Sequence, residues 1–325
     1  MKKPLLYVVI PCYNEQEVLP VTLDLFVNKL TSLKIGNIVS EDSKIMFVDD
    51  GSKDDTWQII CNGVETYREH VCGIQQSRNR GHQNALVAGM MESKKLGCDC
   101  VVTMDCDGQD DINAIDKMLE AYVVDSCQVV YGVRASRNQD TVFKRSTAHG
   151  YYKVLQWLGV DLVYDHADYR LVTKPVLDAF SDYEEVNLFL RGIFPLIGFK
   201  STTVAYERTE RIAGESKYPL SKMIHLAVDG ISSLSVKPLN MIAVFGMIVS
   251  VLSFIGCVWA FVAHLTGNAV AGWASTTCIV SFVCGCQLMC TGILGVYIGK
   301  IYMEVKHRPR YIISNTVGID EEDGV

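Results

Sequence analysis

Two long stretches without a charged residue constrain this chain more than any other feature of its sequence. Residues 239–263 and 272–299 contain no Asp, Glu, Lys or Arg. Each stretch exceeds the roughly 20 residues that a helix needs to cross a bilayer. Only residues 264–271 join them, so we predict an antiparallel transmembrane hairpin. The alternative is a pair of core helices in a soluble domain, which seldom contains two such runs side by side.

Basic residues flank the predicted hairpin on one side only. Lys237 precedes the first stretch, and the connecting loop has no Lys or Arg. Four basic residues follow the second stretch: Lys300, Lys306, Arg308 and Arg310. The positive-inside rule therefore places both flanks in the cytosol and the protein in the cytoplasmic membrane, with membrane lipids as partners. The hairpin also offers a surface for forming a homo-oligomer.

Two further apolar patterns suggest contact with the membrane surface. Within residues 216–235, one helical face collects the apolar side chains at spacings of three and four. They are Leu220, Met223, Ile224, Ala227, Ile231 and Leu234. We expect a helix lying in the interface over 215–236, the alternative being a helix packed on the domain. Residues 189–197 form a second apolar stretch that we expect to dip into the interface, with Arg191 reaching the headgroups.

The first 214 residues alternate strand-like and helix-like patterns. We predict strands at 5–10, 44–48, 73–76, 100–104 and 129–133. We predict helices at 17–33, 54–67, 83–96 and 113–124. This alternation predicts an α/β fold with a mostly parallel sheet, covered by helices on both faces. The expected organisation is a cytosolic catalytic domain over 1–214, the interfacial helix, two spans over 237–300 and a cytosolic tail over 301–325. We expect the tail to be polar and mobile after Arg310.

Composition excludes several other classes of protein. The net charge is −7 and the pI is about 5.5, so nucleic acid is not an expected partner. The 12 cysteines include no Cys-x-x-Cys spacing, which favours free thiols in a reducing compartment over a zinc site. The N-terminus becomes polar too early for a signal peptide. The domain is therefore expected in the cytoplasm.

Polar motifs follow three of the predicted strands. Residues 11–15 read Pro-Cys-Tyr-Asn-Glu, residues 49–52 read Asp-Asp-Gly-Ser, and residues 105–110 read Asp-Cys-Asp-Gly-Gln-Asp. Ligands of such sheets bind at the carboxyl ends of the strands. Two carboxylates spaced by one residue can hold Mg²⁺ or Mn²⁺ beside a diphosphate. Taken singly, each motif could also be a turn, a helix cap or a solvated acidic loop.

Together these motifs resemble the GT-A fold of glycosyltransferase family 2. The resemblance continues through further segments at 78–83, 131–134, 144–145, 168–171 and 208–218. With the apolar hairpin, the chain is similar to the polyprenyl-phosphate glycosyltransferases, such as bactoprenol glucosyltransferases and dolichol-phosphate mannosyltransferases. The metal motif departs from the family, whose members commonly have Asp-Ala-Asp-Leu-Gln-Asp-Pro. Two spans instead of four favour the bacterial branch.

The resemblance implies a metal-dependent, inverting transfer of a hexose from UDP-glucose or UDP-N-acetylglucosamine to undecaprenyl phosphate. It implies Asp105, Asp107 and Gln109 as ligands of Mg²⁺ or Mn²⁺. Its catalytic residues would be Asp107, Asp168 and Arg211. The nucleotide sugar would contact Pro11, Tyr13, Glu15, Asp49, Asp50, Asn79 and Asp105. The acceptor phosphate would contact Arg134, Arg145, Arg170 and Lys217.

Some assignments stay open at this stage. Asp168 could orient the sugar or the acceptor, or it could be a structural hydrogen-bonding residue. We interpret His82 as structural. Two rival functions are a processive polysaccharide synthase of the same fold and a non-catalytic membrane scaffold. The synthase would need more spans and a Gln-x-x-Arg-Trp segment, and the scaffold would not need the carboxylates of the metal motif. The sequence does not identify the sugar.

Overall fold

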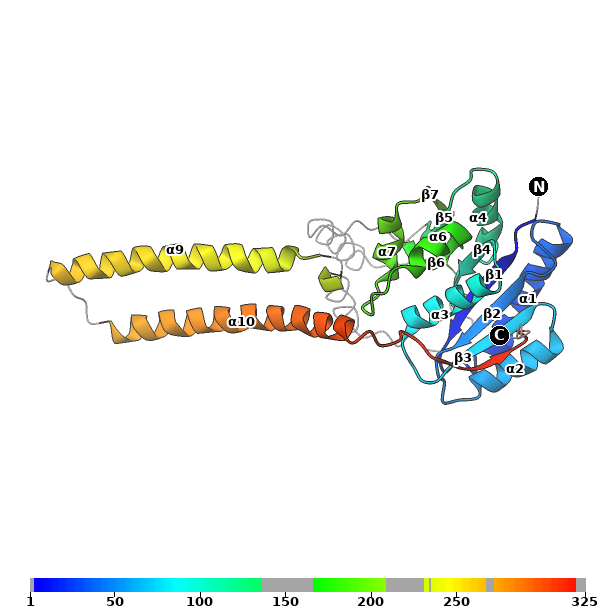
Figure 1. Ribbon diagram of the computed structural model, residues 1–325, viewed down its shortest axis with the longest axis horizontal. Coiled ribbons are helices and arrows are strands. Elements are labelled where there is room, and N and C mark those ends of the chain that lie inside the picture. Colours follow the sequence, from blue (N-terminus) through cyan, green and yellow to red (C-terminus); the bar gives the residue numbers. More distant parts are fainter. Residues whose placement is uncertain (1–2, 136–165, 209–230, 234, 267–271, 320–325) are drawn as a thin grey trace.

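The computed structural model of the protein describes residues 3–135, 166–208, 231–233, 235–266 and 272–319. An α/β domain carries a long pair of helices that project away from it (Figure 1). The predicted interfacial helix falls almost entirely outside the described residues, and so do Arg145, Arg211 and Lys217.

An eight-stranded sheet forms the centre of the domain, in the order β7-β5-β6-β4-β1-β2-β3-β8. Its first five strands are β1 (Leu6–Cys12), β2 (Lys44–Asp49), β3 (Val71–Gln76), β4 (Cys100–Thr103) and β5 (Val129–Arg134). The last three are β6 (His166–Thr173), β7 (Ser201–Tyr206) and β8 (Ile313–Val317). The pairs β1–β2, β1–β4, β2–β3 and β5–β7 are parallel. β6 runs antiparallel between β4 and β5, so the sheet is mixed.

Helices cover both faces of this sheet, as the sequence predicted. On one face lie α1 (Leu19–Ile35), α2 (Thr56–Thr66) and α4 (Ala114–Val123). On the other lie α3 (His82–Lys95), α6 (Lys174–Ser181) and α7 (Leu190–Ile197). Each face has its own hydrophobic core. The five predicted strands and four predicted helices of the first 134 residues are confirmed, with shifts of a few residues at their ends.

The first strand shows how the sequence builds these two cores. All seven residues of β1 are buried. Leu6, Val8 and Ile10 join the core beneath α1, and Tyr7 and Val9 join the core beneath α3. Alternate side chains of a strand point to opposite faces, so a strand covered on both sides reads as a continuous apolar run. The same pattern marks β2 and β4, where the predictions were also correct.

Part of the tail after Arg310 forms a strand, which corrects our expectation of a mobile tail for the residues up to 319. Residues Ile313–Val317 form β8, which pairs antiparallel with β3 from Gly73↔Val317 to Gln76↔Ile313. The strand is only five residues long and mostly polar, so it lacks the hydrophobic pattern of a buried strand. Backbone pairing at the open edge of β3 orders it. This part of the tail therefore extends the sheet beyond β3.

The apolar stretch 189–197 is also different from our expectation. Phe189, Leu190, Ile193 and Phe194 are at most 3% exposed, and the last three belong to the core beneath α3. They therefore cannot dip into a membrane interface. Arg191 does not reach outward either, because it pairs with Asp168. The stretch was apolar because α7 packs against the sheet, and amphipathicity alone does not distinguish that from membrane contact.

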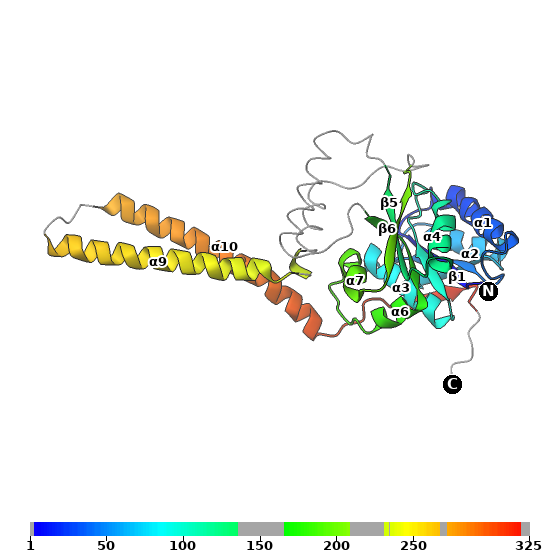
Figure 2. The same cartoon turned by 90° about the horizontal axis from the view of Figure 1, so that it is seen from above.

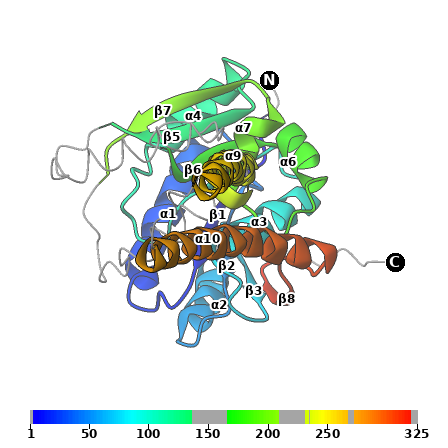
Figure 3. The same cartoon turned by 90° about the vertical axis from the view of Figure 1, so that its left-hand side faces the viewer.

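The projecting pair consists of α9 (Lys237–Leu265) and α10 (Trp273–Val305). Both are long and apolar enough to cross a membrane, in the segments Lys237–Gly256 and Phe282–Val305, and neither segment is buried inside the protein. The helices lie side by side in Figures 1 and 2, and α10 continues toward the domain near α6 and α7. With the hairpin toward the viewer, α9 is seen nearly end-on and α10 extends sideways below it, so the two helices are not parallel (Figure 3). That they span a membrane stays a prediction.

Candidate active site

The polar motifs meet at the carboxyl ends of β1, β2, β3 and β4, where the sequence predicted them. The loops after β1 and β2 are joined by backbone and side-chain hydrogen bonds. The backbone N–H of Asn14 donates to Ser52 Oγ at 2.9 Å, and Lys53 N–H donates to Asn14 Oδ1 at 2.9 Å. Glu15 N–H donates to Thr56 Oγ1 at 2.9 Å. This edge is therefore a preassembled set of loops.

The two aspartates after β2 are buried and already hydrogen-bonded. Asp50 accepts the backbone N–H groups of Arg80 at 2.7 Å and Gly81 at 2.9 Å. Burial raises the pKa of Asp50, and those two donors oppose the rise. Asp49 accepts Ser52 N–H at 3.1 Å and the Gln75 side-chain amide at 2.9 Å. Asp50 thus fastens the loop after β3, while the carboxylate of Asp49 is oriented by the loop after β2 and by the neighbouring strand β3.

Gly51 is required between these loops. Its φ of +66° lies in the region that L side chains rarely adopt. A Cβ built there would lie 2.4 Å from the backbone carbon of Arg78, so a side chain would push apart the loops after β2 and β3. The Asp-Asp-Gly sequence therefore serves close packing of two loops as well as presenting carboxylates.

The other predicted nucleotide residues lie along the same edge with different exposure. Pro11 is buried near the end of β1, and Tyr13 is 40% exposed in the loop that follows. Glu15 is half-buried and Asn79 is exposed in the loop after β3. The structure brings all four to one side of the sheet, and their contacts with a nucleotide stay predictions.

Three carboxylates crowd the loop after β4. The Gln109 N–H donates to Asp107 Oδ1 at 3.1 Å, and Asp107 is 7% exposed. Burial and the nearby charge of Asp105 raise the pKa of Asp110 to about 6, against the opposing effects of Tyr206 and Arg208. Such an excess of negative charge fits a site for a divalent cation.

The ligand set that the protein offers such a cation is small. Within the described ranges, no three Asp, Glu, His or Cys side chains converge in a geometry that could hold a metal. The amide oxygen of Gln109 accepts a hydrogen bond from Arg208 at 2.6 Å. Asp105 and Asp107 fit a Mg²⁺ or Mn²⁺ site of the kind that uses one or two carboxylates and completes its shell with substrate phosphates. Gln109 would join it only by releasing Arg208.

His82 links this loop to Asp168, a role that the sequence analysis missed. Its Nε2 lies 3.7 Å from Asp105 Oδ1 and 3.6 Å from Asp168 Oδ2, and its side chain is 41% exposed. Burial lowers the pKa of His82, but Asp168 and Asp105 outweigh it, so the net pKa is raised. The signal was present in the sequence, because His82 belongs to the segment 78–83 that carries part of the family resemblance, and it is the first residue of α3.

Asp168 lies at the centre of a group of cationic side chains. Arg191 donates to its Oδ2 at 3.0 Å, and Arg170 pairs with its Oδ1. Burial alone would raise the pKa of Asp168, but Arg191, His82 and Arg170 hold it well below its usual range. The carboxylate is therefore ionised at neutral pH. It can orient a hydroxyl or balance a cation, but it is a weak proton acceptor.

Arg170 does not lie where a phosphate could reach it. Its side chain is 1% exposed, and its guanidinium lies 5.0 Å from the centre of the Phe194 ring. It also donates to the Leu190 carbonyl at 3.3 Å. The prediction that Arg170 contacts the acceptor phosphate thus disagrees with its burial, and the structure assigns it to holding Asp168 and α7.

Arg134 ends β5 close to the carboxylate loop. The neighbouring Tyr206 donates its hydroxyl to Asp110 Oδ1 at 2.7 Å. Burial and Asp110 raise the pKa of Tyr206, and the charge of Arg134 opposes this rise. The Nε of Arg134 is buried without a hydrogen-bond partner in the part of the chain that is described. Arg134 is therefore a half-buried cation at the site, as predicted, although its ligand is untested.

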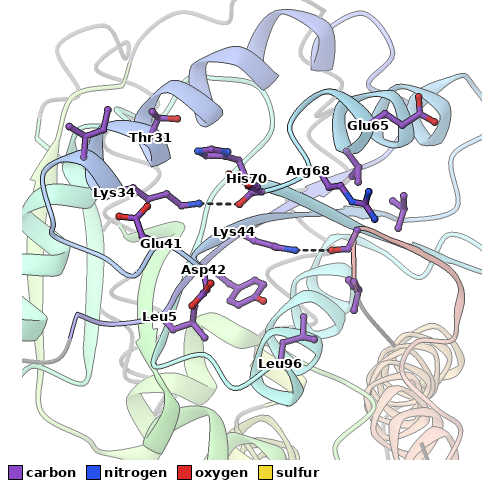
Figure 4. Close-up of a pocket in the computed structure, with 17 residues that line it drawn as sticks. Leu5, Thr31, Lys34, Glu41, Asp42, Lys44, Glu65, Arg68, His70 and Leu96 are labelled. Carbon is purple, nitrogen blue, oxygen red and sulfur yellow. Dashed lines mark hydrogen bonds between the residues drawn. The ribbon is translucent and has the colours of Figure 1, made fainter. Parts of the chain in front are cut away.

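A cleft of about 1150 Å³ lies at the opposite edge of the sheet (Figure 4). It lies at the amino ends of β1, β2 and β3, with Lys34, Lys44, Glu41 and Asp42 among its charged lining residues. Lys44 donates to the Gly318 carbonyl at 2.9 Å. Because charges of both signs line it and none of the polar motifs reaches it, the cleft is separate from the candidate site.

Comparison with known proteins agrees with this geometry. The model of Glycosyl transferase family 2 matches residues 7–180. The chain is 47% identical over 313 residues to the Bacillus subtilis glycosyltransferase YkoT, covering 96% of this chain and 91% of that one. It is 35% identical over 309 residues to the bactoprenol glucosyl transferase of Shigella phage SfV, covering 94% and 97%. It is also similar to the solved glucosyl-3-phosphoglycerate synthase from Mycobacterium tuberculosis, at 16% identity and a TM-score of 0.44 over 71% and 78% of the chains.

Proposed function

Because this chain belongs to glycosyltransferase family 2, we propose that it transfers a hexose from a nucleotide sugar to a polyprenyl phosphate at a membrane surface. The observation that carries this proposal is the position of His82, whose Nε2 lies within 3.7 Å of both Asp105 and Asp168. It joins the carboxylate loop, where a diphosphate would bind, to a second charged group formed by Asp168, Arg170 and Arg191. Two anionic substrates could meet between them.

The donor half of the reaction belongs to the edge formed by β1 to β4. Asp49 and the loops that Asp50 fastens would hold the nucleotide. Asp105 and Asp107 would hold Mg²⁺ or Mn²⁺, which when bound offsets the charge that develops on a diphosphate leaving group. UDP-glucose and UDP-N-acetylglucosamine are the proposed donors, and the name of the bactoprenol glucosyl transferase relatives supports a glucosyl group.

The acceptor half belongs to Asp168 and its surroundings. A phosphate monoester is already ionised near pH 7, so its attack on the sugar carbon C1 does not require a strong base. This fits the depressed pKa of Asp168, which favours orientation of a hydroxyl over proton abstraction. Attack opposite the leaving diphosphate would invert the anomeric centre. Positioning and electrostatic stabilisation would then provide most of the catalysis.

The membrane assignment rests on the hairpin and the relatives. We propose that α9 and α10 span the cytoplasmic membrane, with the domain on the cytoplasmic side and undecaprenyl phosphate as the acceptor. The bactoprenol glucosyl transferases match nearly the whole chain, including both helices. Arg145, Arg211 and Lys217 stay predicted contacts of the two phosphates, and homo-oligomer formation through the hairpin stays a prediction.

The test is transfer by the purified full-length protein in detergent. UDP release from UDP-glucose, UDP-N-acetylglucosamine and UDP-galactose is measured with and without undecaprenyl phosphate. We expect release with one donor that depends on the lipid and yields one sugar per lipid phosphate. A polymer product would instead indicate a processive synthase, and no release with any donor would reject the proposal.

A further inference from the structure

Glu304, in the last turn of α10, binds the catalytic domain through three hydrogen bonds. Its Oε2 accepts the backbone N–H of Val186 at 2.8 Å. Its Oε1 accepts both the backbone N–H of Asn187 at 2.9 Å and the Asn187 side-chain amide at 2.6 Å. Hydrogen bonds to a carboxylate are among the stronger ones in proteins. A charged side chain near the end of an apolar helix is therefore directed at the domain.

The loop that Glu304 binds leads directly into the candidate site. Asn187 precedes Leu190, the first residue of α7, by three positions. The backbone N–H of Leu190 donates to Gln83 at 3.0 Å, and its carbonyl accepts from Arg170. The next residue, Arg191, pairs with Asp168 at 3.0 Å. A shift of α10 along its axis would therefore be transmitted to the arginine that holds Asp168.

The Asn187 side-chain amide also donates to the Lys300 carbonyl of α10 at 3.4 Å, whereas two further contacts of α10 go to a different segment. Tyr297 donates to the Ser235 carbonyl at 2.7 Å, and Lys300 donates to Ser233 at 2.8 Å. Ser233 and Ser235 precede α9, so these contacts join the two ends of the hairpin to each other. Glu304 instead joins the hairpin to the loop before α7, beside the end of α10 that approaches the domain in Figure 2.

We propose that Glu304 and Asn187 form a positioning pair that sets the height of Asp168 and Arg191 above the membrane surface. This inference rests on the proposed transfer to a polyprenyl phosphate. The phosphate of such a lipid is held at a fixed depth by its chain, whereas a soluble nucleotide sugar approaches from any depth. Loss of the pair should therefore weaken the use of a long-chain acceptor in a bilayer and leave the use of the nucleotide sugar unchanged.

The test compares two acceptors in kinetics with the full-length protein. Undecaprenyl phosphate is supplied in lipid nanodiscs, and a short, water-soluble prenyl phosphate is supplied in detergent. For Glu304→Gln we expect KM for the long-chain lipid to rise on the order of tenfold, because a charged acceptor of three bonds is lost. KM for the nucleotide sugar and kinetics with the short acceptor should stay within about twofold. Asn187→Ala, which keeps the two backbone bonds, should show a smaller effect of the same kind.

Glu185→Gln is the matched control, because it removes a neighbouring carboxylate of the same loop. It should leave both acceptors unaffected, and the unfolding midpoint of Glu304→Gln should stay near that of the unchanged protein. The inference is wrong if Glu304→Gln leaves the lipid KM unchanged, or if it weakens both acceptors equally. If the unchanged protein transfers sugar to neither acceptor, the proposed function fails instead, which is a separate result.

Discussion

The donor edge and the Asp168 group are built in opposite ways. At the donor edge, short loops that follow consecutive strands are held together by short polar side chains that accept backbone N–H groups, as Asp50 does from Arg80 and Gly81. Around Asp168, long side chains come from three separate elements, namely α3, β6 and α7. The first region is fixed by hydrogen bonds between side chains and the backbone, and the second by a balance of charges.

This difference predicts whether a substitution in each region will affect activity or stability. At the donor edge, a change to a carboxylate that does not fasten another loop, such as Asp107, should alter ligand contacts while the loops keep their shape. A change around Asp168 should leave a buried charge without its partner, which is costly because the remaining charge stays desolvated. Activity should therefore be the sensitive readout for the first region, and stability for the second.

The largest expected effect is the loss of turnover in Asp107→Ala. This change removes one of two carboxylates available to a divalent cation, and the loss of such a stabilising group reduces turnover by about 1000-fold. The unfolding midpoint should change little. Asp111→Ala removes a half-buried carboxylate of the same loop region that is not among the predicted metal ligands, so it is the control and should retain activity. Full activity of the unchanged protein in excess EDTA would contradict the metal role.

Arg170→Met should mainly destabilise the protein. Arg170 is buried against Phe194 and paired with Asp168, so its removal leaves a buried carboxylate with fewer partners. We expect a loss of about 3 kcal/mol in the free energy of unfolding, measured by chemical denaturation of the full-length protein in detergent. A stable Arg170→Met variant with a raised KM for the lipid phosphate would restore the sequence-based assignment of Arg170 as an acceptor contact.

The same contrast explains what the sequence could predict. β1 to β5, their helices and the motifs at the strand ends were readable because apolar periodicity and turn residues are local signals. β8 was missed because pairing at the edge of β3, and not its own pattern, orders Ile313–Val317. His82 and Arg191 were assigned to other roles because their contacts with Asp168 depend on the packing of α3 and α7 against the sheet. Sequence spacing carries no information about such distant partners.

β8 adds a smaller, testable contribution to the donor edge. Asn315 donates its side-chain amide to Gln75 Oε1 at 2.6 Å, and Gln75 donates to Asp49 Oδ2 at 2.9 Å. Asn315→Ala should loosen the orientation of Asp49 and raise KM for the nucleotide sugar about threefold, with kcat little changed. Thr316→Ala, on the same strand, is the control. An unchanged KM in Asn315→Ala would show that Gln75 holds Asp49 without help from β8.

The smallest effects concern two histidines with opposite environments. Burial and Lys34 lower the pKa of His70 at the amino ends of the strands, whereas Asp168 and Asp105 raise the pKa of His82. Below about pH 6.5, the unfolded chain binds a proton at position 70 more readily than the folded protein does, so His70 lowers stability as pH falls. His82 does the reverse: its contribution to stability is present at low pH and is lost as pH rises through its folded pKa.

His70→Gln should therefore reduce the loss of stability that occurs when the pH falls from 7.5 to 5.5, and His82→Gln should increase that loss. We expect each change to be about 0.5 kcal/mol, because both side chains are partly solvated. Unfolding midpoints of each variant and of the unchanged protein at the two pH values show whether the loss of stability becomes smaller or larger. The same sign for both variants would contradict the charge balance assigned to Asp168.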